Sequence, residues 1–185
     1  ERSEAGPFDG WPTSLGFEYF YGFPHGDTDQ YEPNLYRGIG KVDPDEGKGE
    51  MLDRRLAGDI IRWVHNQKAG APDKPFFVYF APGSTHAPHQ APPEYIARFK
   101  GRFDQGWDKV REETWRRQLA MGVIPRGTKL TPRPAEIPAW VSLTPGQKAF
   151  AARAMEVAAA QLAYQDEQIG RVIDDWCDAG RVATA

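Results

Sequence analysis

The pattern of hydrophobic and polar positions changes near residue 51. Before that point the chain is dense in Gly, Pro and aromatic residues and shows no sustained helical period, which is typical of packed loop with short extended pieces. So long an irregular stretch is uncommon in a compact domain unless it binds something or lies over a larger body. We therefore expect residues 1–50 to form a loop-rich segment on the substrate side of the protein.

Helical patterns begin at residue 51. One face carries the apolar residues that predict a helix over residues 51–68, namely Leu52, Leu56, Ile60, Trp63 and Val64. Shorter helices are expected over residues 94–99 and 107–121.

A sharp helix start follows a proline-punctuated connector. Thr144 can act as the N-cap, Pro145 fits the first helical position, and Gln147 stands at the capping-box position. The apolar stripe that follows predicts one long helix, with a glycine stop at Gly180.

Residues 76–80 form an uninterrupted aromatic and β-branched run, Phe-Phe-Val-Tyr-Phe. Such runs are typical of strands buried on both faces, so we expect a central, parallel strand. A helix followed by this strand predicts an α/β fold, mostly helices and loops around one or a few central strands. Ligands in such folds bind just past the carboxyl ends of strands, where a proline-stiffened loop here holds His86 and His89.

Composition excludes several classes of protein. With 185 residues, 40% of them hydrophobic, the chain can form one domain or part of one. A net charge of -3 argues against a nucleic-acid binder, and no apolar run is long enough to span a membrane.

The single cysteine excludes an internal disulfide. Proteins without disulfides are usual in the cytoplasm, so we expect a cytoplasmic location, with the periplasm as the alternative. Glu1-Arg2 is neither a signal peptide nor an initiator methionine, so we expect an upstream part to be missing.

His86 is the first candidate for chemistry. An imidazole at a strand's carboxyl end can donate to a developing oxyanion or protonate a leaving group; a plain hydrogen-bonded loop histidine is the alternative. His86 and His89 could instead hint at zinc, but zinc needs three or four ligands. Ser84 could be a hydrolase nucleophile, yet its surroundings are not the GxSxG elbow.

The N-terminal aromatic residues allow two interpretations. They could line a pocket for an aryl ester or form core, and core is the commoner outcome. The residues concerned are Trp11, Tyr19, Phe20, Tyr21, Phe23, Tyr31 and Tyr36.

The segment from Lys74 to Pro92, which contains Thr85-His86-Ala87-Pro88-His89, resembles the strand and histidine loop of bacterial type I arylsulfatases, of the alkaline-phosphatase-like superfamily. The likeness covers most of the chain. It extends over residues 6–23, 32–37, 103–108, 111–113, 137–140 and 155–157.

The resemblance implies that the chain is part of a sulfatase catalytic domain with an alkaline-phosphatase-like fold. In that family a cysteine in a CxPSR motif becomes formylglycine, whose hydrate attacks sulfur while a calcium-type ion binds sulfate oxygens. His86 matches the histidine that contacts the sulfate and the leaving oxygen, and His89 would be a substrate-pocket residue. The substrate implied is a small-molecule sulfate ester.

The chain departs from the family pattern in lacking CxPSR, paired N-terminal aspartates, GKxH and a downstream Asp-Asn pair. By this comparison the chain contains neither the formylglycine cofactor nor the metal ligands of the family. We expect missing N- and C-terminal parts of the same enzyme to supply both. The chain alone should therefore be inactive. Cys177 has an arginine four positions later, but it lies after the histidine loop and without the expected flanks, so we interpret it as structural. The alternatives are a phosphatase or phosphodiesterase of the same superfamily and a non-catalytic binding or structural module.

Overall fold

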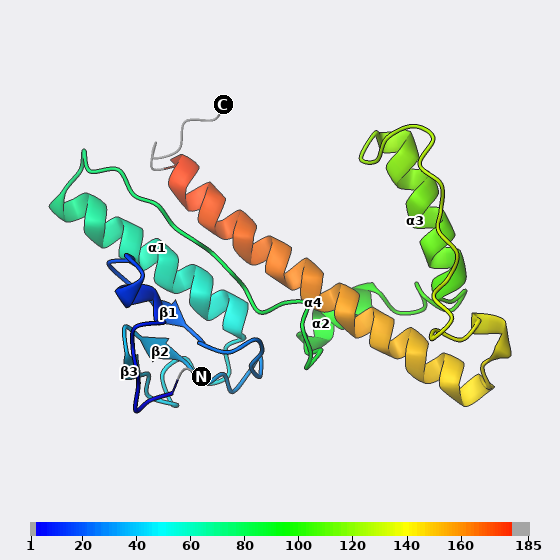
Figure 1. Ribbon diagram of the computed structural model, residues 1–185, viewed down its shortest axis with the longest axis horizontal. Coiled ribbons are helices and arrows are strands. Elements are labelled where there is room, and N and C mark those ends of the chain that lie inside the picture. The colour runs from blue at the N-terminus through cyan, green and yellow to red at the C-terminus, as the bar shows by residue number, and fades with distance from the viewer. Residues whose placement is uncertain (1–2, 179–185) are drawn as a thin grey trace. The chain divides into compact units, whose positions relative to one another are not determined.

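The computed structural model describes residues 3–178, which are largely helical (Figure 1). The chain divides into two compact units. One unit consists of Glu1–Pro92 and Gln161–Ala185, and the other of Pro93–Ala160. The long helix α4, Pro145–Asp178, belongs partly to each unit.

The first unit begins with irregular chain that carries a short 3-10 helix, η1 (Pro12–Ser14), and a small sheet. Strands β1 (Tyr21–Gly22), β2 (Tyr36–Arg37) and β3 (Gly40–Lys41) pair antiparallel in that order. Tyr36 pairs with Lys41 across a two-residue turn in which Gly38 has a φ of 61°, a conformation that favours glycine. The short extended pieces expected in this region are these three strands.

Helix α1, Leu52–Gly70, packs its apolar face on this sheet region, as its spacing predicts. Leu52 and Leu56 join Leu35 and Val42 in a buried cluster, and Phe80 packs against its edge. Burying such side chains is the main force that holds a helix of this length in place. The predicted helix is confirmed, with its end two residues later than expected.

A second cluster of the same unit surrounds Trp11, whose side chain is fully buried. The ring of Tyr36 meets it edge-on with centroids 5.1 Å apart, and Phe8 and Phe20 approach it in the same manner. Edge-on pairs of this kind add to the free energy gained by burial alone. Trp11 therefore anchors the N-terminal chain to the sheet.

The prediction of a central strand at residues 76–80 is wrong. The segment is extended, but it pairs with no strand in the part of the chain that the structure describes. Its side chains alternate instead of being buried on both sides: Phe76 packs on Trp176 of α4, whereas Phe77 is 76% exposed. A ladder requires a neighbouring backbone, and residues 3–178 place none beside this segment.

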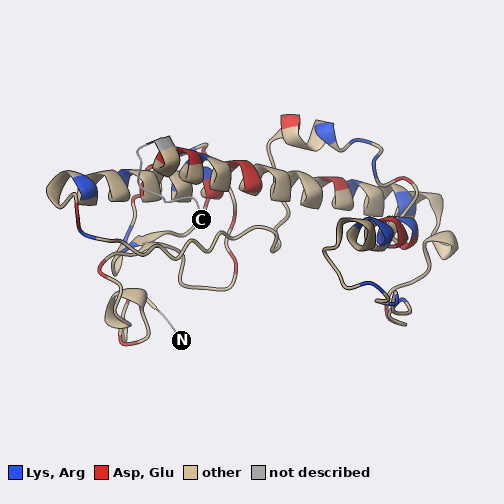
Figure 2. Cartoon of the chain, turned by 90° about the horizontal axis from the view of Figure 1, so that it is seen from above, with Lys and Arg blue, Asp and Glu red and all other residues tan. Residues whose placement is uncertain are grey.

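The second unit contains α2 (Pro93–Arg98), α3 (Trp107–Met121), a 3-10 helix, η2 (Trp140–Ser142), and the start of α4. These three α-helices begin within one residue of their predicted positions. Figure 2 shows both acidic and basic residues along α3, a helix without buried residues. Trp107 and Trp140 pack edge-on, 4.9 Å apart.

The start of α4 confirms the predicted capping box. The Thr144 N–H donates to Oε1 of Gln147 at 2.9 Å, and the Gln147 N–H donates to Oγ1 of Thr144 at 3.3 Å. The predicted stop at Gly180 lies outside the described residues. Within residues 3–178, no helix combines the length and apolar character needed to cross a bilayer.

Candidate active site

The histidine loop, residues 83–90, follows the extended segment directly. It opens with a tight turn in which the His86 N–H donates to the Gly83 carbonyl at 3.1 Å. Gly83 lies so close to α1 that a Cβ atom there would be 3.2 Å from Leu52 Cδ2 and 3.3 Å from Phe23 Cζ. Glycine at this position lets the loop begin against the apolar core.

His86 has one ring nitrogen occupied and one without a partner. Nδ1 lies 2.9 Å from the carbonyl oxygen of Ala87, and because a carbonyl only accepts, Nδ1 carries the proton. Nε2 has no hydrogen-bond partner among residues 3–178 and is the nitrogen that can exchange a proton with a ligand. An Asp27 carboxylate oxygen lies 3.8 Å from Nδ1, on the same side of the ring as the Ala87 carbonyl.

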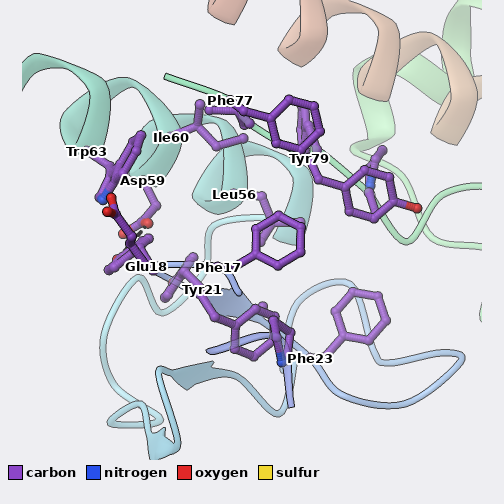
Figure 3. Close-up of a pocket in the computed structure, with 18 of the residues that line it drawn as sticks. Phe17, Glu18, Tyr21, Phe23, Leu56, Asp59, Ile60, Trp63, Phe77 and Tyr79 are labelled. Carbon is purple, nitrogen blue, oxygen red and sulfur yellow. Dashed lines mark hydrogen bonds between the residues drawn. The ribbon is translucent and has the colours of Figure 1, made fainter. Parts of the chain in front are cut away.

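An apolar groove of about 1330 Å³ ends at the histidine loop. Its walls are residues 15–26, one face of α1, and residues 74–86. Figure 3 shows Phe17 and Phe77 near each other across it, with Ile60 beside Phe77; the two phenyl rings are 6.4 Å apart. The volume exceeds that of ordinary small-molecule pockets, so the groove alone defines no substrate site.

The aromatic residues divide between the two interpretations. Trp11 and Tyr36 are core, as favoured. The groove is lined by Tyr19, Phe20, Tyr21 and Phe23, of which Phe20 also packs on Trp11, and Tyr21 and Phe23 pack on the buried cluster of Leu35. Tyr31 is half-buried outside the groove. 

His89 is exposed and does not share a partner with His86. Its Nδ1 lies 3.3 Å from Oε1 of Gln161, a fully buried side chain of α4. Within residues 3–178 no group of three or more His, Cys, Asp or Glu side chains could hold a metal ion. The described residues therefore provide no set of ligands for zinc, nor for the calcium ion that the resemblance implies.

Ser84 binds an acid that the sequence did not single out. Its Oγ donates to Oδ2 of Asp53 at 2.6 Å, so the hydroxyl is directed at a carboxylate and not at a histidine. Burial raises the pKa of Asp53, although the bond from Ser84 acts in the opposite direction. The helical spacing of Asp53 with Leu56, Ile60 and Val64 was the available signal, because it places this acid on the apolar face of α1.

The other two histidines and the cysteine lie elsewhere in the first unit. His25 is an exposed residue on the groove wall. His65 of α1 lies with Nε2 2.9 Å from a carboxylate oxygen of Asp175 of α4. Cys177 is an exposed, free thiol near the end of α4.

The chain belongs to the sulfatase family, whose sequence model matches residues 3–181. It is 38% identical over 182 residues to an arylsulfatase of Klebsiella aerogenes, a match that covers 92% of this chain and 38% of that protein. It is 39% identical over 102 residues to an uncharacterized sulfatase of Schizosaccharomyces pombe (strain 972 / ATCC 24843), covering 54% of this chain and 18% of the relative. The chain thus spans well under half the length of either relative.

Proposed function

We propose that this chain forms part of an enzyme that hydrolyses sulfate esters, and that His86 assists departure of the alcohol or phenol. The observation that carries this proposal is the hydrogen bond from Nδ1 of His86 to the Ala87 carbonyl, which leaves Nε2 free. Membership of the sulfatase family and the likeness to an arylsulfatase support the substrate class.

The chemistry asked of His86 is a single proton transfer. In the imidazolium form both ring nitrogens carry protons, with Nδ1–H bonded to Ala87 and Nε2–H available to the ester. As the bond between sulfur and the ester oxygen breaks, negative charge develops on that oxygen, and transfer of the Nε2 proton neutralises it. The ring becomes neutral imidazole and keeps its bond to Ala87.

The nucleophile and the metal site would come from parts of the protein outside these 185 residues. Formylglycine and a calcium-type ion supply the attack on sulfur and the binding of sulfate oxygens in the family that the chain resembles. His89 is a candidate pocket residue because it lies three positions from His86 in the same exposed loop. 

The proposal is tested by two activity measurements. The purified 185-residue chain should not turn over 4-nitrophenyl sulfate, and the full-length protein should hydrolyse it in preference to 4-nitrophenyl phosphate. Enzyme-like turnover by the chain alone would overturn the proposal that the nucleophile and the metal site lie outside these 185 residues. A preference for the phosphate ester would support the phosphatase alternative instead.

A further inference from the structure

Both ends of the histidine loop are tied to buried parts of the first unit. At the beginning, Ser84 donates to the buried Asp53 at 2.6 Å. At the end, the Gln90 side chain makes two bonds: its Nε2 donates to Oδ2 of Asp29, and its Oε1 accepts the Gln30 N–H, both at 2.8 Å. His86 lies between these two attachments.

The two attachment points are themselves joined by a backbone hydrogen bond. The Leu52 N–H donates to the Gln30 carbonyl at 2.7 Å, so the first turn of α1, which carries Asp53, is joined to the residues that bind Gln90. The side chains of Asp53 and Gln30 are 0% and 1% exposed. Buried hydrogen bonds that involve a charged group are among the stronger ones in proteins.

Asp29 is itself held in place. Its Oδ1 accepts the backbone N–H groups of Tyr31 and Glu32, both at 2.8 Å. Burial opposes its ionisation, but the bonds from Glu32, Gln90 and Tyr31 outweigh that effect and lower the pKa of this carboxyl. Asp29 is therefore a charged, fixed acceptor for the Gln90 amide near neutral pH.

We propose that Asp53, through Ser84, and Gln90 are positioning residues that clamp the histidine loop at both ends and fix where Nε2 of His86 points. The proposal rests on the proposed function only for what His86 then does. The ring of His86 is bonded to the carbonyl of its own neighbour, Ala87, so it moves with the loop. An otherwise exposed loop therefore needs outside attachments to hold this ring within the small tolerance that catalysis requires.

The first test uses the 185-residue chain and needs no activity. Backbone ¹⁵N relaxation reports how rigid the N–H bonds of residues 85–87 and 89 are. In the parent chain their order parameters should be near the rigid value of about 0.85, and in Ser84→Ala or Gln90→Ala they should fall toward about 0.6. Ser84→Thr, which keeps a hydroxyl, should retain the parent values. Ser142→Ala, which removes a hydroxyl bond in the second unit, is the matched control.

The clamp is wrong if Ser84→Ala and Gln90→Ala, both folded by circular dichroism, leave these order parameters at the parent values. It is equally wrong if Ser142→Ala lowers them by the same amount. If Ser84→Ala fails to fold, Gln90→Ala alone decides, because its side chain lies at the opposite end of the loop.

The second test asks whether the clamp acts through His86 in the full-length enzyme. Gln90→Ala should lower kcat for phenyl sulfate about tenfold or more, and it should have little further effect when His86 is already alanine. Equal losses in both backgrounds would contradict action through His86. If His86→Ala itself has no effect, the proposed function fails, and the order parameters still decide whether the clamp exists.

Discussion

The hydroxyl of Ser84 donates to the carboxylate of Asp53 at 2.6 Å, joining the histidine loop to the first turn of a helix 31 positions earlier in the chain. Asp53 is fully buried, and its other carboxylate oxygen, Oδ1, has no hydrogen-bond partner among residues 3–178. Burying a carboxylate that is only half satisfied favours its neutral form, which is why the pKa of Asp53 is raised.

Asp53→Asn tests this environment through the pH dependence of stability. Because the pKa of Asp53 is raised from the ordinary value of 3.8, the folded chain holds a proton that the unfolded chain releases as the pH rises above that value. The free energy of unfolding of the parent therefore loses this contribution as the pH rises through the window between the two pKa values. The asparagine does not ionise, so the stability of the variant relative to the parent should increase with pH.

Urea unfolding at about pH 4 and about pH 8 measures this difference. Asp73→Asn, a change of an exposed residue, is the control and should show no comparable trend. A stability difference between Asp53→Asn and the parent that is constant with pH, or that shrinks as the pH rises, would be inconsistent with a raised pKa.

Gly106→Ala should destabilise the second unit strongly. Gly106 precedes α3 with a φ of 83°, and a Cβ atom there would overlap the ring of Trp140. Gly122 has a similar φ of 73° but nothing within 4 Å of its would-be Cβ. Gly122, with a ψ of 14°, is in the left-handed helical region, so Gly122→Ala reports the strain of that backbone conformation, about 1 kcal/mol. Gly106 has a ψ of 167°, a conformation almost confined to glycine, so backbone strain and overlap with Trp140 together should make Gly106→Ala cost about 3 kcal/mol or more. If the two variants lose the same free energy of unfolding, measured by heat or urea, then Trp140 does not fill the space beside Gly106.

The helices were predictable because their signals are local. The capping box at Thr144 and Gln147 and the apolar face that begins at Leu52 each involve residues within a few turns of one helix. The strand expected at residues 76–80 failed for the opposite reason. An aromatic run shows that a segment favours the extended state, but a strand also needs a neighbouring backbone, and nothing within the run specifies one.

The candidate site could be predicted only in part. His86 stood out because of its residue type, its proline-rich loop and its likeness to a known family. Its surroundings did not stand out, because Asp53, Asp27 and Gln90 reach the loop or anchor it through contacts between positions as far as 61 apart in the chain. Residue types at such separations form no pattern that periodicity or spacing reveals.

The apolar groove should make the isolated chain bind a hydrophobic dye such as anilinonaphthalene sulfonate. Phe77 and Tyr79 are 76% and 73% exposed on its wall, and contiguous apolar surface of this kind binds such dyes. The double substitution Phe77→Lys and Tyr79→Lys should lower the dye fluorescence with little change in thermal stability. Val141→Lys, at an exposed apolar side chain in the second unit, is the control. Dye fluorescence that is the same in the double variant and the parent would contradict an open groove.

The most direct test of the central claim is the dependence of His86→Ala on the leaving group in the full-length enzyme. His65→Ala, which removes a histidine paired with Asp175, is the matched control and should behave like the parent. We expect His86→Ala to lower kcat for phenyl sulfate, a poor leaving group, by about a hundredfold or more, with a much smaller loss for 4-nitrophenyl sulfate. The same fractional loss for both esters, or no loss for phenyl sulfate, would contradict proton donation by His86.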